Sequence, residues 1–360
     1  MAATWSSDVD RAANPGATLV APVHAFDTGA LAAYLRSRVD DFAGDLVVEQ
    51  FQGGQSNPTY RITSDDRRYI LRRKPPGKLL PSAHAVDREY RVMSALAATG
   101  VPVAKMIALC EDDAVIGTAF YLMEYVEGRV LWDPTLPGMT PRMRGAHYDE
   151  LNRVLATLHQ VDYVAIGLGD FGRTAQYIER QVARWSKQYQ AGGAEPIPAM
   201  DRLIEWLPRH IPPDDETSIV HGDFRLDNVI FHPTEPRVLA VLDWELSTLG
   251  HPLSDFAYQV MAWRLAPQQF RGLQGEDLAT LGIPTEEQYV AAYCRRTGRK
   301  GIPHWDFYLI FNMFRITAIL HGVLARALQG NASSRNAIET GGRARLVADV
   351  AWDMARRIDA

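Results

Sequence analysis

The sequence predicts an α+β fold of two lobes, in which a small antiparallel β-sheet lobe precedes a larger, mainly helical lobe. The 360 residues, of which 47% are hydrophobic and 22% charged, suffice for two separate cores. Strand-like runs occupy the first part of the chain, whereas the apolar residues beyond position 255 recur at helical spacing. We expect residues 1–25 to be an extension, residues 26–127 the first lobe and residues 128–360 the second.

The first lobe is predicted to contain two helices and an antiparallel sheet. One helix should begin at Asp27 and Thr28, which suit an N-terminus, and run to about Val39. Another is expected over residues 84–99, where Gly100 would end it. The strand-like runs that predict the five-stranded sheet are residues 46–51, 59–63, 68–73, 103–110 and 118–126.

The second lobe is predicted from segments with the apolar spacing of packed helices. These segments are residues 255–264, 286–297, 305–329 and 335–357. The apolar stretch 308–328 contains Asn312, Arg315, His321 and Arg326. A central Arg costs about 2.5 to 3.5 kcal/mol in a membrane, so we expect a buried helix and no membrane span.

The most informative motif is HGDFRLDN at residues 221–228, which a further acidic residue, Asp243, follows. Phosphoryl transfer needs one carboxylate that orients the attacking hydroxyl and accepts its proton, and it needs oxygen ligands for magnesium. Asp223 suits the first role, and Asn228 and Asp243 suit the second. The apolar runs 229–231 and 238–242 predict a hairpin that brings these two ligands together. A polar loop and a capping Asp would explain either segment alone, but both in this order predict a phosphotransferase.

These residues resemble the aminoglycoside phosphotransferase and choline kinase families, which share the protein-kinase-like fold. The resemblance extends in order over most of the chain, and it is carried by HGDFRLDN, by LDWE at residues 242–245 and by GHPLSD at residues 250–255. It implies Asp223 as the catalytic base, Asn228 and Asp243 as magnesium ligands, and Asp255 as an anchor of the catalytic loop. Arg225 falls where protein kinases place a Lys that contacts the transferred phosphate, and a solvated loop Arg is the alternative.

The resemblance also implies a nucleotide site on the first lobe. Residues 52–58 form a turn in which Gly54, Ser56 and Asn57 would bring backbone N–H groups to phosphate oxygens, and a plain hairpin turn is the alternative. Arg72 stands where many relatives carry Lys, and its planar fork can bind phosphate oxygens in pairs. Lys74, two residues later, is the second candidate for this cation.

Two further segments complete the expected nucleotide site. Glu89 would pair with the strand cation, although a helix-surface Glu beside Arg88 and Arg91 is the alternative. The backbone groups of Glu124 and Val126 would hold the nucleobase. Because backbone groups would contact the base, ATP and GTP both stay open, with ATP as the default.

Two conspicuous features are expected to be structural, and one further loop is a candidate cover of the acceptor site. GLGDFG at residues 167–172 matches a dinucleotide-binding string and contains Asp-Phe-Gly. It follows a helical segment and precedes the catalytic loop, so we expect a plain loop. His159 should cap or pack a helix end. Residues 267–284, punctuated by Gly and Pro, form a loop that could cover the acceptor.

Composition limits the partners. The net charge of −5 and the lack of a long Lys/Arg run argue against a nucleic-acid partner and favour a neutral or cationic small-molecule acceptor. Cys110 and Cys294 form neither a disulfide framework nor a metal spacing, which indicates a reducing compartment. The N-terminal residues lack a basic segment followed by an apolar one, so we expect a cytoplasmic protein. The oligomeric state is left open.

A finer resemblance is carried by ILRRKPPG, HAVDREYRVMSAL and LDWELSTLGHPLSD. These stretches are most similar to a subgroup that includes the phosphotransferase-like domain fused to acyl-CoA dehydrogenases, which acts on hydroxyacyl-CoA substrates. We therefore expect an ATP-dependent kinase that phosphorylates a hydroxyl of a small molecule. An antibiotic-modifying aminoglycoside kinase and a nucleotide-binding pseudokinase scaffold are the alternatives.

Overall fold

The computed structural model describes residues 17–40, 42–51, 57–77, 84–329 and 337–360. The chain forms two compact units that are not continuous in sequence. The first unit comprises Met1–Trp132 and Asp227–Glu245, and the second comprises Asp133–Leu226 and Leu246–Ala360. The hairpin segment that carries Asn228 and Asp243 therefore clusters with the first part of the chain.

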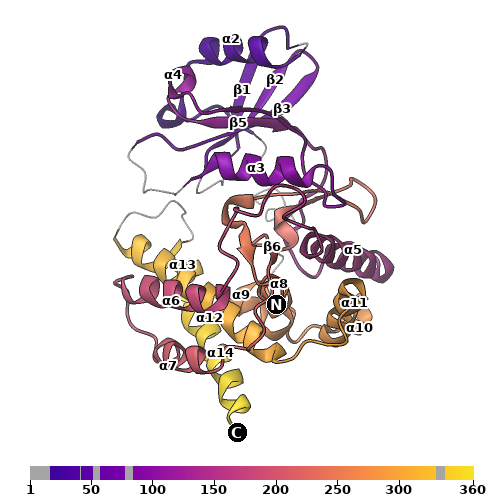
Figure 1. Cartoon of the computed structure of the whole chain (residues 1–360), viewed down its shortest axis with the longest axis vertical. Helices are drawn as coiled ribbons and strands as arrows, with labels where there is room; N and C mark the ends of the chain where they lie inside the picture. Colours follow the sequence, from indigo (N-terminus) through magenta and orange to yellow (C-terminus); the bar gives the residue numbers. More distant parts are fainter. Residues whose placement is uncertain (1–16, 41, 52–56, 78–83, 330–336) are drawn as a thin grey trace, which may run out of the picture. The chain divides into compact units, whose positions relative to one another are not determined.

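The predicted five-stranded antiparallel sheet is confirmed in the first unit, with the strand order β1-β2-β3-β5-β4 (Figure 1). The strands are β1 (Leu46–Gln50), β2 (Thr59–Ser64), β3 (Arg67–Arg73), β4 (Met106–Cys110) and β5 (Phe120–Glu124). The helices of this unit are η1 (Pro22–His24), α2 (Thr28–Arg38), α3 (Val86–Leu96) and α4 (Asp113–Ile116). The side chain of Asp27 accepts a hydrogen bond from the Ala30 N–H, which confirms the predicted start of α2.

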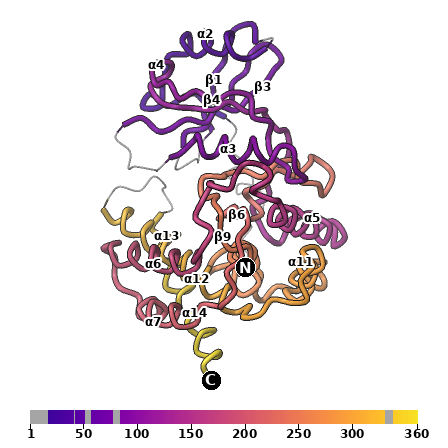
Figure 2. Tube along the Cα trace, in the orientation of Figure 1, coloured from indigo at the N-terminus to yellow at the C-terminus, as the bar shows by residue number. Residues whose placement is uncertain are grey.

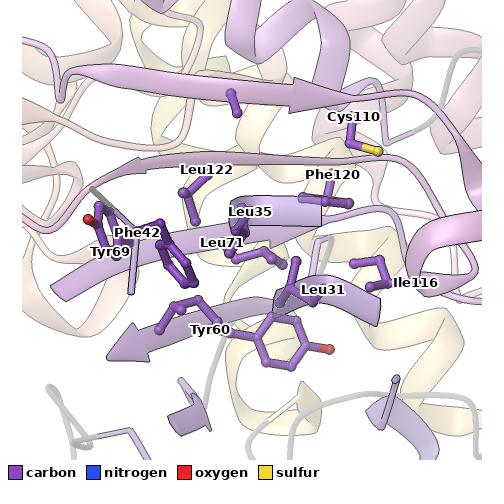
Figure 3. Packing of buried hydrophobic residues seen from close by; sticks show 12 residues of the cluster. Leu31, Leu35, Phe42, Tyr60, Tyr69, Leu71, Cys110, Ile116, Phe120 and Leu122 are labelled. Carbon is purple, nitrogen blue, oxygen red and sulfur yellow. The ribbon is translucent and has the colours of Figure 1, made fainter. Parts of the chain in front are cut away.

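One face of this sheet forms the apolar core of the first unit (Figure 3). Alternate residues of a strand point to opposite faces, so Tyr60, Leu71 and Leu122 gather on the same side as Leu31 and Leu35 of α2. The intervening residues of β3 and β5, which include Ile70, Arg72, Tyr121 and Met123, belong to the opposite face. The pleat therefore separates the face that forms this core from the face that carries Arg72 and Tyr121.

The predicted hairpin is confirmed as β7 (Val229–Phe231) paired antiparallel with β8 (Val238–Val241). The Leu242 N–H donates to the Asn228 carbonyl oxygen at 2.8 Å, directly before Asp243. Asn228 and Asp243 consequently lie at the same end of the hairpin, as their spacing predicts.

The second unit is mainly helical, and in Figure 2 its two short strands, β6 (Ser218–Val220) and β9 (Thr248–Gly250), run side by side. Its central helix, α12 (Trp305–Leu328), packs against α6, α8, α13 and α14. Its other helices are α5 (Pro141–His159), α6 (Tyr177–Gln190), α7 (Pro198–Trp206), η2 (Leu207–Arg209), α8 (Pro252–Val260), η5 (Met261–Arg264), α9 (Pro267–Phe270), α10 (Leu278–Leu281), α11 (Glu286–Thr297), α13 (Ala337–Gly342) and α14 (Ala344–Ile358). The single-turn helices η3 (Leu226–Asn228) and η4 (Trp244–Leu246) flank the hairpin where the chain passes between the units.

Three helices differ in their bounds from the prediction, and the one expected over residues 84–99 spans only Val86–Leu96. The helix expected from residue 255 begins at Pro252, because proline suits the first turn and the His251 side chain accepts the Leu253 N–H. The segment expected as one helix over residues 335–357 is divided at Arg343 into α13 and α14. Helix α12 has the length and apolarity of a membrane span, but 78% of its most apolar window is buried, as in the core helix of a soluble protein.

Replacing Leu122, which is fully buried, by Ala should destabilise the protein by about 2 to 5 kcal/mol, because the cavity left behind is only partly refilled. Val47→Ala is the matched control, since Val47 is 54% exposed on β1 and should change the free energy of unfolding by less than about 0.5 kcal/mol. Chemical denaturation measures both values, and equal losses would contradict the placement of Leu122 in the core.

Candidate active site

The loop after β6 is held in the second unit by the buried carboxylate of Asp255. Oδ2 of Asp255 accepts the backbone N–H of His221 at 2.7 Å, and Oδ1 accepts that of Gly222 at 2.8 Å. Nε2 of His159, at the end of α5, lies 3.2 Å from Oδ2. Burial alone would raise the pKa of Asp255, but the hydrogen bond from His159 and its neighbours lowers the pKa below the usual value. The anchoring contacts implied for Asp255 are present.

Gly222 is required by the shape of this loop. Its φ of +85° is left-handed, and a Cβ there would lie 2.8 Å from the Leu246 carbonyl oxygen. The loop therefore turns sharply just before Asp223. The Asp223 N–H donates to Nδ1 of His221 at 3.2 Å, so both residues that precede Asp223 take part in holding it.

Asp223 and Arg225, the two predicted catalytic residues, lie next to each other in the second unit. Nε of Arg225 is 3.3 Å from Oδ1 of Asp223, and the side chains are 29% and 17% exposed, respectively. The guanidinium thus faces the carboxylate from within the same loop. This contact makes Arg225 part of the surroundings of Asp223 and not a fully solvated side chain.

In the first unit, Arg72 contacts three carboxylates. Its Nε is 3.1 Å from Glu89, and its Nη2 is 2.9 Å from Asp243 and 3.4 Å from Glu245. The expected pairing of Glu89 with the strand cation is confirmed. Burial alone would lower the pKa of Arg72, but the nearby carboxylates, Glu89 first among them, raise it above its usual value. Arg72 is therefore permanently charged.

The carboxylate of Glu89 has further donors besides Arg72. Nδ2 of Asn57 donates to Oε1 at 2.8 Å, and the Tyr121 hydroxyl donates to Oε2 at 3.0 Å. Burial raises the pKa of Glu89 while Arg72 opposes the shift. The Asn57 side chain, fully buried, is thus used to hold Glu89. Gly54 and Ser56, the other predicted residues of this turn, lie outside the described residues.

The charges around Arg72 bear on where a divalent cation could bind. Three carboxylates face one guanidinium, so their negative charge exceeds the positive charge beside them. In the described part of the chain, no group of three or more His, Cys, Asp or Glu residues could hold a metal ion. A magnesium site would therefore depend on the amide oxygen of Asn228 and the carboxylate of Asp243, together with phosphate oxygens and water. Asp243 has a left-handed φ of +63°, which Asp tolerates better than most residues.

A pocket of about 310 Å³ lies within the first unit. Its polar lining includes Arg72, Asn228 and Asp243, and the segment that contains Glu124 and Val126 also borders it. Its apolar lining includes Ile70, Met93, Ala104, Met123, Ile230 and Val241. The pocket thus combines apolar walls with the predicted phosphate and metal groups.

Lys74, the second candidate for the phosphate-binding cation, is placed differently. It follows the last residue of β3, and its Nζ lies 3.9 Å from Oδ1 of Asp87 on α3. Arg72 lines the pocket, whereas Lys74 is not among the lining residues. The geometry therefore favours Arg72 for this role.

Sequence reasoning missed two contributors to the site. Glu245 contacts Arg72, although the motif that contains it suggested a role for Asp243 alone. His159 joins α5 to Asp255 and also forms a hydrogen bond with the Tyr293 hydroxyl at 2.7 Å. It therefore does more than cap or pack the end of α5, which was the role expected from the sequence. The acidic character of Glu245 was a usable signal, while nothing near His159 in the sequence indicates its partners.

The two remaining loops named from the sequence, residues 167–172 and 267–284, lie in the second unit. Residues 167–172 form turns, as expected, and Leu168 and Phe171 are fully buried. The segment 267–284 contains α9 and α10 and is attached at several points. The Leu273 N–H donates to the Ala262 carbonyl at 2.7 Å, and Nε1 of Trp263 donates to the Pro284 carbonyl at 2.8 Å. These bonds tie the segment to the helix before it.

Comparison with known proteins places this arrangement among phosphotransferases. A family model described as the phosphotransferase enzyme family matches residues 47–311. A crystal structure from Ralstonia eutropha, of a protein provisionally named an aminoglycoside phosphotransferase, is 58% identical with a TM-score of 0.85. That match covers 92% of this chain and 99% of the other.

Two further proteins match most of this chain but differ in how much of their own length is matched. Mouse acyl-CoA dehydrogenase family member 10 is 49% identical over 347 residues, which are 95% of this chain but 32% of that protein, so the chain spans about a third of this relative. A ternary complex of aminoglycoside phosphotransferase APH(4)-Ia with AMP-PNP and hygromycin B is 18% identical with a TM-score of 0.56. The match covers 89% of this chain and 98% of that one, and it shows the shared fold.

Asp255→Asn should destabilise the protein at pH 7 by on the order of 3 kcal/mol, because an amide cannot accept all the donors that the buried carboxylate accepts. The pKa of Asp255 is depressed in the folded state, so its stabilisation is complete above the unfolded value of about 3.9 and is lost as the pH falls through the lower folded value. Urea unfolding at several pH values should show the difference between wild type and variant shrinking below about pH 4. A difference that stays constant down to pH 3 would contradict this account.

Arg72→Met should weaken binding of magnesium-ATP about tenfold to a hundredfold, since charge-assisted hydrogen bonds to phosphate are lost. Lys74→Met, which removes the alternative cation, should change the affinity less than about threefold. Titration calorimetry measures both, and Arg72→Lys tests whether charge alone suffices. A larger loss in Lys74→Met than in Arg72→Met would reverse the assignment.

Proposed function

The chain belongs to the phosphotransferase enzyme family, and we propose that it transfers the γ-phosphate of a nucleoside triphosphate, ATP by default, to a hydroxyl group of a small molecule. The family match confirms the resemblance seen in the motifs, and with it the protein-kinase-like fold. The acceptor, the nucleotide and the metal are parts of the proposal.

The pocket of the first unit is the observation that carries this function. A nucleotide presents a flat apolar base and a highly charged phosphate chain, and the pocket offers apolar side chains beside Arg72 and the two magnesium ligands. The Glu124 N–H already donates to the Lys105 carbonyl at 2.9 Å, so we assign the base contacts to the Glu124 carbonyl and to Val126. The base would then lie against the apolar side chains of the pocket.

Arg72 would bind the inner phosphates and is positioned for this by Glu89. Asn228 and Asp243 would hold magnesium, which when bound neutralises charge on the phosphate oxygens. In this structure Arg72 contacts Asp243 directly. Phosphate oxygens would take over the contacts of Arg72 with Asp243 and Glu245, while Glu89 keeps the guanidinium in place.

Asp223 would orient the acceptor hydroxyl and accept its proton as the new O–P bond forms and the bond to the leaving nucleoside diphosphate breaks. Five positions along the chain separate Asp223 from Asn228, which limits their Cα separation to about 18 Å. Arg225 beside Asp223 would stabilise negative charge on the transferred phosphate.

The acceptor class rests on similarity. The strong match to part of an acyl-CoA dehydrogenase family member favours a hydroxyacyl-CoA acceptor, whereas the name of the Ralstonia protein points to aminoglycosides. Aminoglycosides are polycations and would need acidic residues around the acceptor. The Arg225 guanidinium beside Asp223 favours the first class, whose phosphates are anionic, although the net charge of −5 by itself suggested a neutral or cationic acceptor.

Phosphate transfer from magnesium-ATP to aminoglycosides, choline-like amines, hydroxy acids and hydroxyacyl-CoA thioesters tests the proposal. We expect transfer to a single class, abolished in Asp223→Ala, whose affinity for the nucleotide should stay within about threefold of wild type. The control is Asp349→Ala on the exposed face of α14, which should keep full turnover.

Full turnover in Asp223→Ala would remove this residue as the base. Nucleotide binding without transfer to any acceptor would favour a scaffold, the alternative that keeps the pocket but not the reaction. Failure to bind any nucleotide would refute the proposed role of the pocket.

A further inference from the structure

We propose that Tyr258 and Arg315 are positioning residues that hold the catalytic loop and the carboxylate of Asp223 in their working arrangement. The inference rests on the proposed phosphotransfer, in which Asp223 accepts the proton of the acceptor hydroxyl. It adds a side chain from α8 and one from α12 that none of the motifs contains. Both belong to the same compact unit as Asp223.

Arg315 is a buried cation in the middle of the apolar helix α12, where it is 5% exposed. Burying a guanidinium is costly, and within the described ranges no carboxylate forms an ion pair with it. Its Nη2 donates to the carbonyl oxygen of Gly222, the residue directly before Asp223. Its Nε has no hydrogen-bond partner among the described residues. Such a departure from the usual rules of burial is typical of a functional position.

Two aromatic rings lie against this guanidinium. The Arg315 Cζ is 5.2 Å from the ring centroid of Tyr258 and 5.7 Å from that of Trp185. The negative faces of aromatic rings attract a cation, which offsets part of the cost of burial. Arg315 is thus held between α6 and α8 with its fork directed at the loop.

Tyr258 connects this cation to the catalytic base. It is 4% exposed, its ring lies against Arg315, and the Asp223 carboxylate is near enough to raise the pKa of its hydroxyl. Burial raises the pKa of the Tyr258 hydroxyl, and the Asp223 carboxylate raises it further. The phenol therefore stays protonated, and in our proposal it donates to the Asp223 carboxylate and restricts the rotation of that carboxylate.

Side chains from other segments hold the turn at left-handed Gly222. Asp255 accepts the N–H groups of His221 and Gly222, and Arg315 donates to the Gly222 carbonyl oxygen. Asp223 follows at once in the chain. A small rotation of this peptide would move the carboxylate away from the acceptor hydroxyl, and such misplacement is costly for catalysis.

The test measures kcat and KM of purified full-length variants. The substrates are magnesium-ATP and the acceptor that the transfer assay described above identifies. Tyr258→Phe removes the hydroxyl and keeps the ring beside Arg315, so kcat should fall about tenfold to a hundredfold while KM for ATP stays within about twofold. Arg315→Met should lower kcat at least as far. Arg315→Lys should recover part of the loss, because an ammonium can still donate to the Gly222 carbonyl.

The matched control is Tyr148→Phe. Tyr148 is also 4% exposed in the second unit, and its hydroxyl donates to the Pro134 carbonyl at 2.6 Å. Loss of the Tyr148 hydroxyl should leave kcat within about twofold of the wild-type value. The melting temperature should fall by as much as it does in Tyr258→Phe. This pair separates the loss of a buried hydroxyl from the loss of the contact with Asp223.

A second readout needs no acceptor. Amide hydrogen exchange of residues 218–226 should be faster in Arg315→Met than in wild type, and close to wild type in Arg315→Lys and Tyr148→Phe. If wild type transfers phosphate to no acceptor, the proposed function fails and the exchange rates decide this inference alone. Unchanged exchange in Arg315→Met, or a kcat within twofold of wild type in Tyr258→Phe and Arg315→Met, would overturn it.

Discussion

The second unit depends on how the carboxylate of Asp255 is satisfied. A buried carboxylate without donors would be strongly unfavourable, so the chain must bring polar hydrogens to it. These come from the His221 and Gly222 backbone after β6 and from His159 at the end of α5, while Asp255 itself lies in the first turn of α8. One side chain therefore joins three separate segments. The shape of the loop that carries Asp223 is a consequence of this requirement.

The first unit contains the opposite case, in which a largely buried cation, Arg72, must be neutralised by carboxylates. Arg72 points to the face of the sheet that lacks the apolar core, and Glu89 of α3, 2% exposed, needs its charge. Asp243 and Glu245 reach the same guanidinium from beyond β8. A cation shared among carboxylates is suited to exchange partners, because phosphate oxygens can replace some of them. In the proposed function, the ion pair with Glu89 is the contact that Arg72 keeps.

Much of the fold was predictable because its signals are local. Alternation in residues 59–73 and Gly or Pro at the ends of the runs indicated strands, and Asp27 indicated a helix start. The motif 221–228 was informative because its chemistry demands particular residues at short spacing. Glu245, His159, Tyr258 and Arg315 carry no such signal, since each works through a partner that is distant in the sequence.

The sequence by itself determined the class of fold, the hairpin that brings Asn228 and Asp243 together, and the family of the chain. Each of these follows from periodicity, turn residues or a motif within a few tens of residues. Only the tertiary structure decided that Arg72 and not Lys74 borders the pocket, and that Arg315 reaches the loop before Asp223. The physical reason is that side-chain direction and the satisfaction of buried charges depend on which distant segments pack together, and no local pattern records that.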